Sequence, residues 1–445
     1  MYWAEGPEAE AGVVFGVGQA DESLAWAGVT RLTLHHIAAG VPGATSSVGL
    51  THAEMRVRGG PDDIGDRLDA LIAALTSGPT DSLAELRLVL AANQRRPSAA
   101  ATALQTRYGT RGAGLYGRDE YGLCWLGPEE VRSWRDRMLT APNAAAWVVA
   151  PRLLPLRLEL GVRARPLRPF PRPVLAPEPA WRRVLDGDAH LSVTARPSAA
   201  WEAAVAILAR RVGVPSGPVS QQDDLPAGEA HAVVGAPGLE ILVGASTELA
   251  GREPSATELA EHLAGAEDRL RATAISAADL VGWCRREVAR QPGVPRATSL
   301  AAHTALSGAD VVRAWSDSLA TALFLVPPTA DPARTGARAA VRWSAVPAGG
   351  TRHEPVEPDA AHPGKHLVVD DARLTLVLDE ERAISVAFRD ATALRWPGGR
   401  RGLWGEDGTF LNIEPEEWHD GISVAETVDR RVAAPRTVPL IGGSR

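Results

Sequence analysis

Residues 28–36 read Gly-Val-Thr-Arg-Leu-Thr-Leu-His-His. On a helix, positions 31 and 35 lie on one face, at the spacing that lets two histidines bind one metal ion. Arg31 takes the first position, and its guanidinium has no lone pair to donate and repels a cation. Leu34 has no carboxylate and cannot act as a general base. On this face of the predicted helix His35 could act as a ligand, whereas Arg31 could not.

Short patterns on both sides of this stretch follow one another over roughly residues 13–149. A predicted strand that ends at Gly16-Val17-Gly18 comes before Asp21-Glu22. A Gly43-Ala44-Thr45 turn then comes before an alternating strand over 50–57. Two helical stretches, a loop and a last strand are predicted at 64–75, 83–93, 108–123 and 143–149.

In order and spacing these patterns resemble the insulinase-like (M16) metallopeptidases, and the loop and last strand resemble the family's actinobacterial type. Active members carry His-x-x-Glu-His on the first helix. The resemblance implies that Arg31, Leu34 and His35 stand at the first His, the Glu and the second His. The third zinc ligand of active members, a Glu on a later helix, corresponds to Ala92 or Asn93, depending on the alignment. We therefore expect a degenerate motif, with no metal and no catalytic residue in this chain.

Composition and charge limit the class of protein. The chain has 445 residues, 45% of them hydrophobic and 23% charged, with a net charge of −7. A nucleic-acid binder would need a basic face, so this balance argues against one. The two cysteines, Cys124 and Cys284, are far apart and are expected to be free thiols in a reducing compartment. With no predicted signal peptide or membrane span, a cytoplasmic location is expected.

We expect an α+β fold with two M16-type (LuxS/MPP-like) lobes and a small β-rich domain. The first lobe covers 1–160, a Pro/Arg-rich linker covers 161–180, the second lobe covers 181–330, and the β-rich domain covers 340–445. In the second lobe, strands are predicted at 189–195, 231–234, 239–243 and 322–326, and helices at 199–212, 257–271, 277–291 and 308–319.

The C-terminal segment alternates at period two between turns rich in Asp and Gly. Strands are predicted at 366–370, 373–378, 383–388 and 393–396, a hairpin at 402–413 and a short helical turn at 415–419. Such a meander resembles a pleckstrin-homology-like (PH-like) barrel. The basic turn 398–402 is a candidate phosphate site, but a hairpin turn with solvated arginines is the favoured interpretation.

Four residues are candidates for contacts to a peptide. His52 and Glu54 share one face of a strand that borders the substrate cleft in M16 relatives, where a peptide can bind by strand addition. Arg210 and Arg211 lie near the position of an Arg that holds substrate in the second lobe of active members. The accompanying Tyr has no counterpart, because all four tyrosines lie in the first lobe.

Three functions are compatible with this sequence. The favoured one is a non-catalytic subunit that pairs with a zinc-bearing M16 homologue to process peptides, with zinc only in that partner. The second is a homo-oligomeric peptide-binding scaffold without proteolysis. The third is an active zinc metallopeptidase with a displaced motif. We do not expect a monomer, since one two-lobe chain presents half a chamber, and we expect no nucleic-acid partner.

Overall fold

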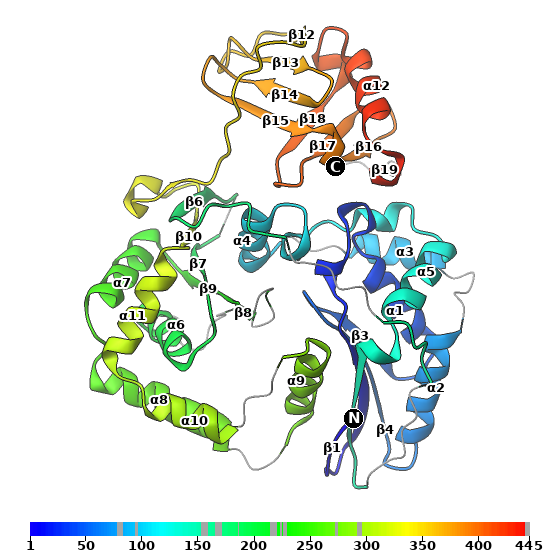
Figure 1. Cartoon of the computed structure of the whole chain (residues 1–445), viewed down its shortest axis with the longest axis vertical. Helices are drawn as coiled ribbons and strands as arrows, with labels where there is room; N and C mark the ends of the chain where they lie inside the picture. The colour runs from blue at the N-terminus through cyan, green and yellow to red at the C-terminus, as the bar shows by residue number, and fades with distance from the viewer. Residues whose placement is uncertain are drawn as a thin grey trace.

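The fold was analysed in a computed structural model of the chain (Figure 1), which describes 1–77, 83–93, 97–152, 159–164, 171–185, 187–213, 220–222, 225, 229–271, 275–291 and 296–440. Three sheet-containing parts follow one another, with the C-terminal part beside the first lobe and at one end of the molecule.

The first sheet has the strand order β1-β5-β2-β4-β3 and is antiparallel except between β1 and β5. Its strands are β1 (Tyr2–Ala4), β2 (Ala9–Phe15), β3 (Ala44–Val48), β4 (Ala53–Gly59) and β5 (Ala144–Val149). One face packs on α1 (Val29–Ala39), α2 (Ile64–Thr76), α3 (Leu83–Ala92) and α5 (Pro128–Met138). Alternate strand residues such as Val13 and Met55 enter this core with Trp134, as the period of two requires.

The second sheet has the order β11-β6-β10-β7-β9-β8. Its strands are β6 (Ala180–Arg183), β7 (Ala189–Ala195), β8 (Ser220–Gln222), β9 (Ala230–Ala236), β10 (Leu323–Val326) and β11 (Arg338–Ala339). The helices of this part are α6 (Ala199–Arg211), α7 (Leu239–Gly251), α8 (Ala256–Arg271), α10 (Arg296–Thr304) and α11 (Gly308–Leu319). Buried Trp201 and Trp315 fill the layer between sheet and helices.

The predicted strand over 239–243 is wrong, because these residues begin helix α7. Leu239, Leu242 and Leu249 are buried while Glu240 and Ile241 are exposed, which is the spacing of a helix rather than a strand. A short apolar run does not separate the two by itself, and here Gly238 supplies the extended residue before the first turn. Helix α10 was not predicted either.

In each lobe, one helix packs against the sheet of the other lobe. Helix α9 (Ala277–Val288) lies on β5, β2 and β1, where Leu280 and Cys284 pack against Val14 and Trp147. In return, α4 (Ala99–Tyr108) packs on β7, β9 and β10. Both sheets therefore have helices on two faces, and Figure 1 shows α9 reaching away from α8 and α10 toward the first sheet.

The C-terminal part contains two four-stranded sheets and one helix. The first sheet holds β12 (Thr351–His353), β13 (His366–Val369), β14 (Arg373–Val377) and β15 (Ala383–Ala387), in that order. The second has the order β18-β17-β16-β19, from β16 (Thr392–Arg395), β17 (Arg401–Trp404), β18 (Phe410–Ile413) and β19 (Thr437–Pro439). The predicted strands agree with this meander, whereas α12 (Gly421–Arg431), which packs on both sheets, was missed.

Short 3₁₀ helices connect these elements at Gln19–Asp21, Leu24–Trp26, Gly112–Leu115, Tyr121–Cys124, Ala141–Asn143, Pro332–Thr335, Phe388–Asp390, Pro415–Glu417 and Ala434–Arg436. The helical turn predicted at 415–419 corresponds to one of them. None of the described helices has the length and hydropathy needed to cross a bilayer.

Candidate functional site

Helix α1 begins at a sharp corner that is held by hydrogen bonds. Gly28 has φ +96°, a conformation that L side chains rarely adopt. The carboxylate of Glu22 accepts hydrogen bonds from the amides of Gly28 at 2.8 Å and Thr30 at 2.9 Å, and so satisfies donors of the first helical turn. Burial raises the pKa of Glu22 to about 8, although these two amides lower it. This corner fixes where the residues of α1 point.

Arg31 does not project freely toward solvent. Its guanidinium forms an ion pair with Glu120 and donates a 2.9 Å hydrogen bond to the carbonyl oxygen of Leu90 on α3. The Glu120 side chain is 9% exposed, and burial raises the pKa of its carboxyl group while Arg31 lowers it. Arg31, which the sequence predicts to stand at the position of a zinc ligand, is therefore a cation whose charge Glu120 compensates.

Leu34 and His35 have separate surroundings. Leu34 is fully buried in the core between α1 and the first sheet. His35 is half-buried, and its Nδ1 is 2.9 Å from the hydroxyl of Ser46 on β3. Burial lowers the pKa of His35, and the positive charge of Arg31 lowers it further. A neutral His35 is thus held by a strand hydroxyl.

The third predicted position, on α3, offers no anionic group. Ala92 is the last residue of α3, and Asn93 turns its amide back to the carbonyl oxygen of Val89 at 2.9 Å. Within the described ranges, no three His, Cys, Asp or Glu side chains converge where they could hold a metal ion. The chemistry gathered around α1 is that of an ion pair and hydrogen bonds.

Glu54 belongs to a charged network on the face of the first sheet opposite its main core. Its Oε1 accepts a 2.9 Å hydrogen bond from Arg56, and its Oε2 lies 3.9 Å from Arg285 of α9. Arg56 also pairs with Glu10 at 3.1 Å and stacks over the Trp147 ring. Glu54 is only 5% exposed. Its charge is already compensated by the neighbouring Arg56 and Arg285.

Strand addition next to His52 and Glu54 is ruled out by the pairing of β4. This strand is bonded to β2 on one side and β3 on the other, so neither of its edges is open. At this end of the sheet the edge strand is β3, and no described strand pairs with its outer side. Thr45 and Ser47 of β3 are exposed, and Ser46 contacts His35. A sheet edge therefore lies directly beside α1.

Arg210 and Arg211 are bound to helix α8. Arg211 makes two hydrogen bonds to the carboxylate of Glu258, at 2.7 and 3.2 Å, and Arg210 donates to the carbonyl oxygen of Glu258 and pairs with Glu261 at 3.7 Å. The Arg211 hydrogen bond lowers the pKa of Glu258 to about 2. The structure thus groups these arginines with α8 and does not bring them to Arg31 or His35.

Sequence reasoning missed Glu120 and the capping role of Glu22. The Arg31–Glu120 pair joins residues that are far apart in the chain, so spacing gives no sign of it. A signal was available for Glu22: a carboxylate shortly before a helix is a common partner for its first amides.

No protein-family model matches this sequence, and no curated protein matches it. Solved structures do. The peptidase M16 inactive domain from Pseudomonas fluorescens matches with a TM-score of 0.56 at 15% identity, over 74% of this chain and 95% of that one. A protease from Helicobacter pylori matches with a TM-score of 0.59 at 11% identity, over 73% and 96%.

The first half of the periplasmic protease PqqL from Escherichia coli matches with a TM-score of 0.55 at 13% identity, over 74% of this chain and 89% of that one. At such identities a likeness shows the fold and does not show the activity. This chain, with two helix-covered sheets and α1 beside a sheet edge, has the fold of the M16-like peptidases.

Proposed function

We propose that this chain is a non-catalytic M16-like subunit that pairs with a zinc-bearing M16 homologue, and that the two together process peptides. The Arg31–Glu120 ion pair carries the proposal. It puts a compensated positive charge at the position that the sequence resemblance assigns to a zinc ligand, within an M16-like fold. A chain that had to hold its own zinc would need a lone pair at this position.

Two further observations support the pairing. Leu34, at the position of the general base, is fully buried in the core, so it contributes packing instead of proton transfer. One of the fold neighbours is itself described as an inactive domain of an M16 peptidase. An M16-like fold without zinc ligands or a general base fits a subunit that completes a chamber. The zinc of that chamber would belong to the partner.

The β3 edge is the place where we propose that a peptide binds. An extended peptide can add a strand there through main-chain hydrogen bonds, and its side chains would then lie near Ser46 and His35. This location replaces the neighbourhood of His52 and Glu54 on β4. Arg210 and Arg211 can contact a peptide only if the peptide displaces Glu258 from their guanidinium groups.

For the C-terminal part, we propose a PH-like domain. Four antiparallel strands, three further antiparallel strands and a helix follow in this order from β12 to α12. The basic turn carries no free pair of cations, since Arg400 lies 2.8 Å from Glu414 and Arg401 pairs with Asp429 at 2.7 Å. These pairs support the interpretation of a hairpin turn over that of a phosphate site.

Co-purification with an M16 homologue that has an intact His-x-x-Glu-His motif tests the subunit proposal. We expect light scattering at micromolar concentration to give the mass of a heterodimer, with an interface on the order of 2,000 Å². Peptide hydrolysis should need both chains, and elemental analysis should find one zinc for each pair. A matched control replaces the Glu of the partner's motif by Gln, which should abolish hydrolysis without separating the chains.

The same measurements distinguish the other two functions. A self-associated chain that binds peptide but ignores the homologue would support the homo-oligomeric scaffold. One zinc in the isolated chain, lost together with hydrolysis on chelation, would support a displaced active site. The double variant Arg31→His, Leu34→Glu is expected to gain no stoichiometric zinc, because Ala92 and Asn93 supply no third ligand.

A further inference from the structure

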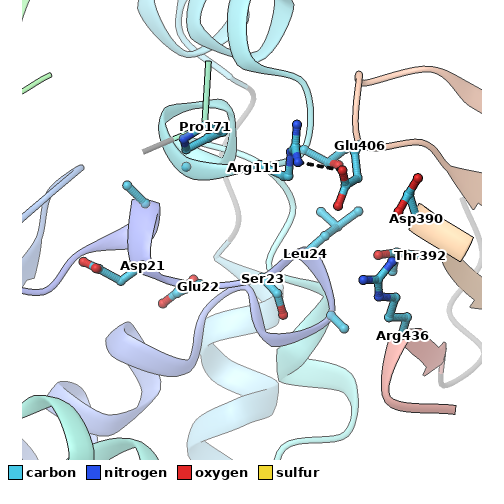
Figure 2. Close-up of a pocket in the computed structure, with 14 residues that line it drawn as sticks. Asp21, Glu22, Ser23, Leu24, Arg111, Pro171, Asp390, Thr392, Glu406 and Arg436 are labelled. Atoms are coloured by element: carbon cyan, nitrogen blue, oxygen red, sulfur yellow. Dashed lines mark ion pairs between the residues drawn. The ribbon is translucent and has the colours of Figure 1, made fainter. Parts of the chain in front are cut away.

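A cavity of about 450 Å³ lies between the first lobe and the C-terminal part (Figure 2). Its size is in the range of small-molecule sites. Residues 20–25 and 110–112 form its walls on the side of the first lobe, and Asp390, Thr392, Glu406 and Arg436 form the opposite wall. The cavity is separate from the Arg31–Glu120 pair and from the β3 edge, since none of their residues lines it.

The two carboxylates on the first-lobe side are held by backbone amides. Asp21 accepts a 3.0 Å hydrogen bond from the amide of Gly18. Glu22 accepts from the amides of Gly28 and Thr30, and burial raises its pKa to about 8, so it is mostly neutral near pH 7. Glu22 is therefore mostly uncharged, and the Asp21 carboxylate is turned toward the amide of Gly18.

The two carboxylates on the opposite wall are paired with arginines. Glu406 lies 2.6 Å from Arg111, an ion pair that spans the two parts of the molecule and is marked in Figure 2. Asp390 accepts a 2.8 Å hydrogen bond from its neighbour Arg389. The charges of Glu406 and Asp390 are therefore compensated by arginines of the protein, and neither carboxylate needs a bound cation.

Arg436 is the unmatched charge. Within the described part of the chain, its guanidinium makes one hydrogen bond, at 2.5 Å to the carbonyl oxygen of Arg389, and has no carboxylate partner. A guanidinium has five donors in a rigid fork, so most of this one is free. Figure 2 shows it beside Thr392 and across the cavity from Leu24 and Ser23. Ser23 starts the short helix Leu24–Trp26 without using its hydroxyl as a cap.

We propose that this cavity binds a small molecule bearing a carboxylate or a phosphate, whose oxygens are held by Arg436 and by the hydroxyls of Ser23 and Thr392. The guanidinium fork matches two oxygens of either group. Because Ser23 comes from the first lobe and the other two residues come from the C-terminal part, the bound anion bridges them. Such a ligand strengthens the docking of the two parts.

Titration of the full chain with sodium phosphate and separately with sodium acetate, with chloride adjusted to constant ionic strength, tests this proposal. Tryptophan fluorescence is a suitable signal, because Trp396 and Trp404 belong to the same apolar cluster as Val438, near Arg436. We expect saturable binding of at least one anion. Saturation by phosphate alone identifies a phosphate-bearing ligand, and saturation by acetate alone identifies a carboxylate-bearing one.

Variants connect the binding to Arg436 and Thr392. Arg436→Gln should weaken binding about 10-fold or more, and Thr392→Val about 5-fold, as expected for a charged and a neutral hydrogen-bond donor. Arg430→Gln is the matched control, since Arg430 is exposed on α12, does not line the cavity and bonds to Thr427. It removes the same charge and should leave binding unchanged.

Two results would overturn the site. One is a linear response to both anions with no saturation. The other is equal affinity in wild type, Arg436→Gln and Thr392→Val, with circular dichroism showing that the variants are folded. If Arg436→Gln does not fold, Thr392→Val alone decides, because that substitution keeps the shape of the side chain and removes only its hydroxyl.

Discussion

At the scale of single residues, α1 shows how a charged side chain is accommodated in a largely buried layer. Arg31 brings a positive charge into the helical layer, and Glu120 and the carbonyl oxygen of Leu90 compensate it. A partly buried ion pair adds little stability when both partners are present, but either partner alone is costly. The pair therefore makes Arg31 and Glu120 interdependent.

Removing one partner should expose that dependence. Glu120→Gln is expected to destabilise the chain by about 1–3 kcal/mol, because the Arg31 guanidinium loses its counter-charge in a largely buried place. The double variant Arg31→Met, Glu120→Met should recover much of this loss. Urea unfolding of Arg31→Met, Glu120→Met and the double variant gives the coupling energy. If the losses of the two single variants simply add in the double variant, the pair is not coupled.

Glu22 should give the stability a distinctive pH dependence. Its carboxyl pKa rises from 4.5 to about 8 on folding, so between these values the folded chain binds more protons than the unfolded chain. Its contribution to stability is complete below pH 4.5 and is lost as pH rises toward 8. Relative to Glu22→Gln, whose amide does not titrate, the Tm of the wild type should fall between pH 5 and pH 8. A constant difference in Tm across this window would contradict the shift.

At the scale of elements, the exchanged helices α9 and α4 hold the lobes together. Leu280 and Cys284 of α9 are buried against Trp147 of the first sheet. Sequence alone predicts α9 as a helix from its Ser276 start and its apolar spacing, but it does not predict which sheet the helix covers. That choice depends on contacts between residues far apart in the chain, which periodicity does not encode.

The same limit explains what was and was not predicted elsewhere. Strands β2, β4 and β5 and helices α1, α2 and α3 were predictable, because their apolar residues recur at a clear period. Strand β1 was not predicted, and β3 begins where a turn was predicted at 43–45. Helix α7 was misread, since Leu239-Glu-Ile-Leu-Val fits a strand as well as a helix over five residues. The assignment of residues 31, 34 and 35 to the positions of a metal motif stays a prediction, and the partner Glu120 was not predicted.

Shortening one side chain of α9 tests the exchanged packing. Leu280→Ala should cost about 2–5 kcal/mol, because it leaves a cavity between α9 and the first sheet. Ile422→Ala, at a position that is 70% exposed on α12, is the matched control and should cost less than about 0.5 kcal/mol. Differential scanning calorimetry should show both lobes shifted together in Leu280→Ala. A shift in one transition only would mean that α9 does not couple the lobes.

At the scale of the whole molecule, the C-terminal part docks on the first lobe. Its β17–β18 hairpin tip lies against Gly109, and Thr110 donates two 3.0 Å hydrogen bonds to it, from its amide to Glu406 and from its hydroxyl to Gly405. Arg118 stacks on the Trp404 ring at 4.6 Å. Aromatic residues from both sides complete this interface, namely Trp26, Tyr121, Trp125, Trp396 and Trp404.

A single methyl group should disturb this docking. A Cβ at Gly109 would lie 2.1 Å from the carbonyl oxygen of Glu406, and Gly109 has φ +67°. Gly109→Ala should therefore loosen the C-terminal part and speed proteolysis within 340–350. Gly65→Ala is the control: it lies in α2 with nothing within 4 Å, so it should leave proteolysis unchanged and slightly stabilise α2. Equal cleavage rates in the two variants would show that the hairpin tip tolerates displacement.

The exchange of α9 and α4 also has a consequence during synthesis, because each sheet face and the helix that covers it are made at different times. The strands around Trp147 leave the ribosome before Leu280, the residue that will cover them. At ~5–20 residues per second, this delay is on the order of ten seconds. Throughout that time the nascent first sheet has one apolar face without its helix, so we expect the newly made chain to depend on chaperones. The same open face can accept α9 from a neighbouring chain, which makes crowded translation the condition in which domain-swapped dimers form.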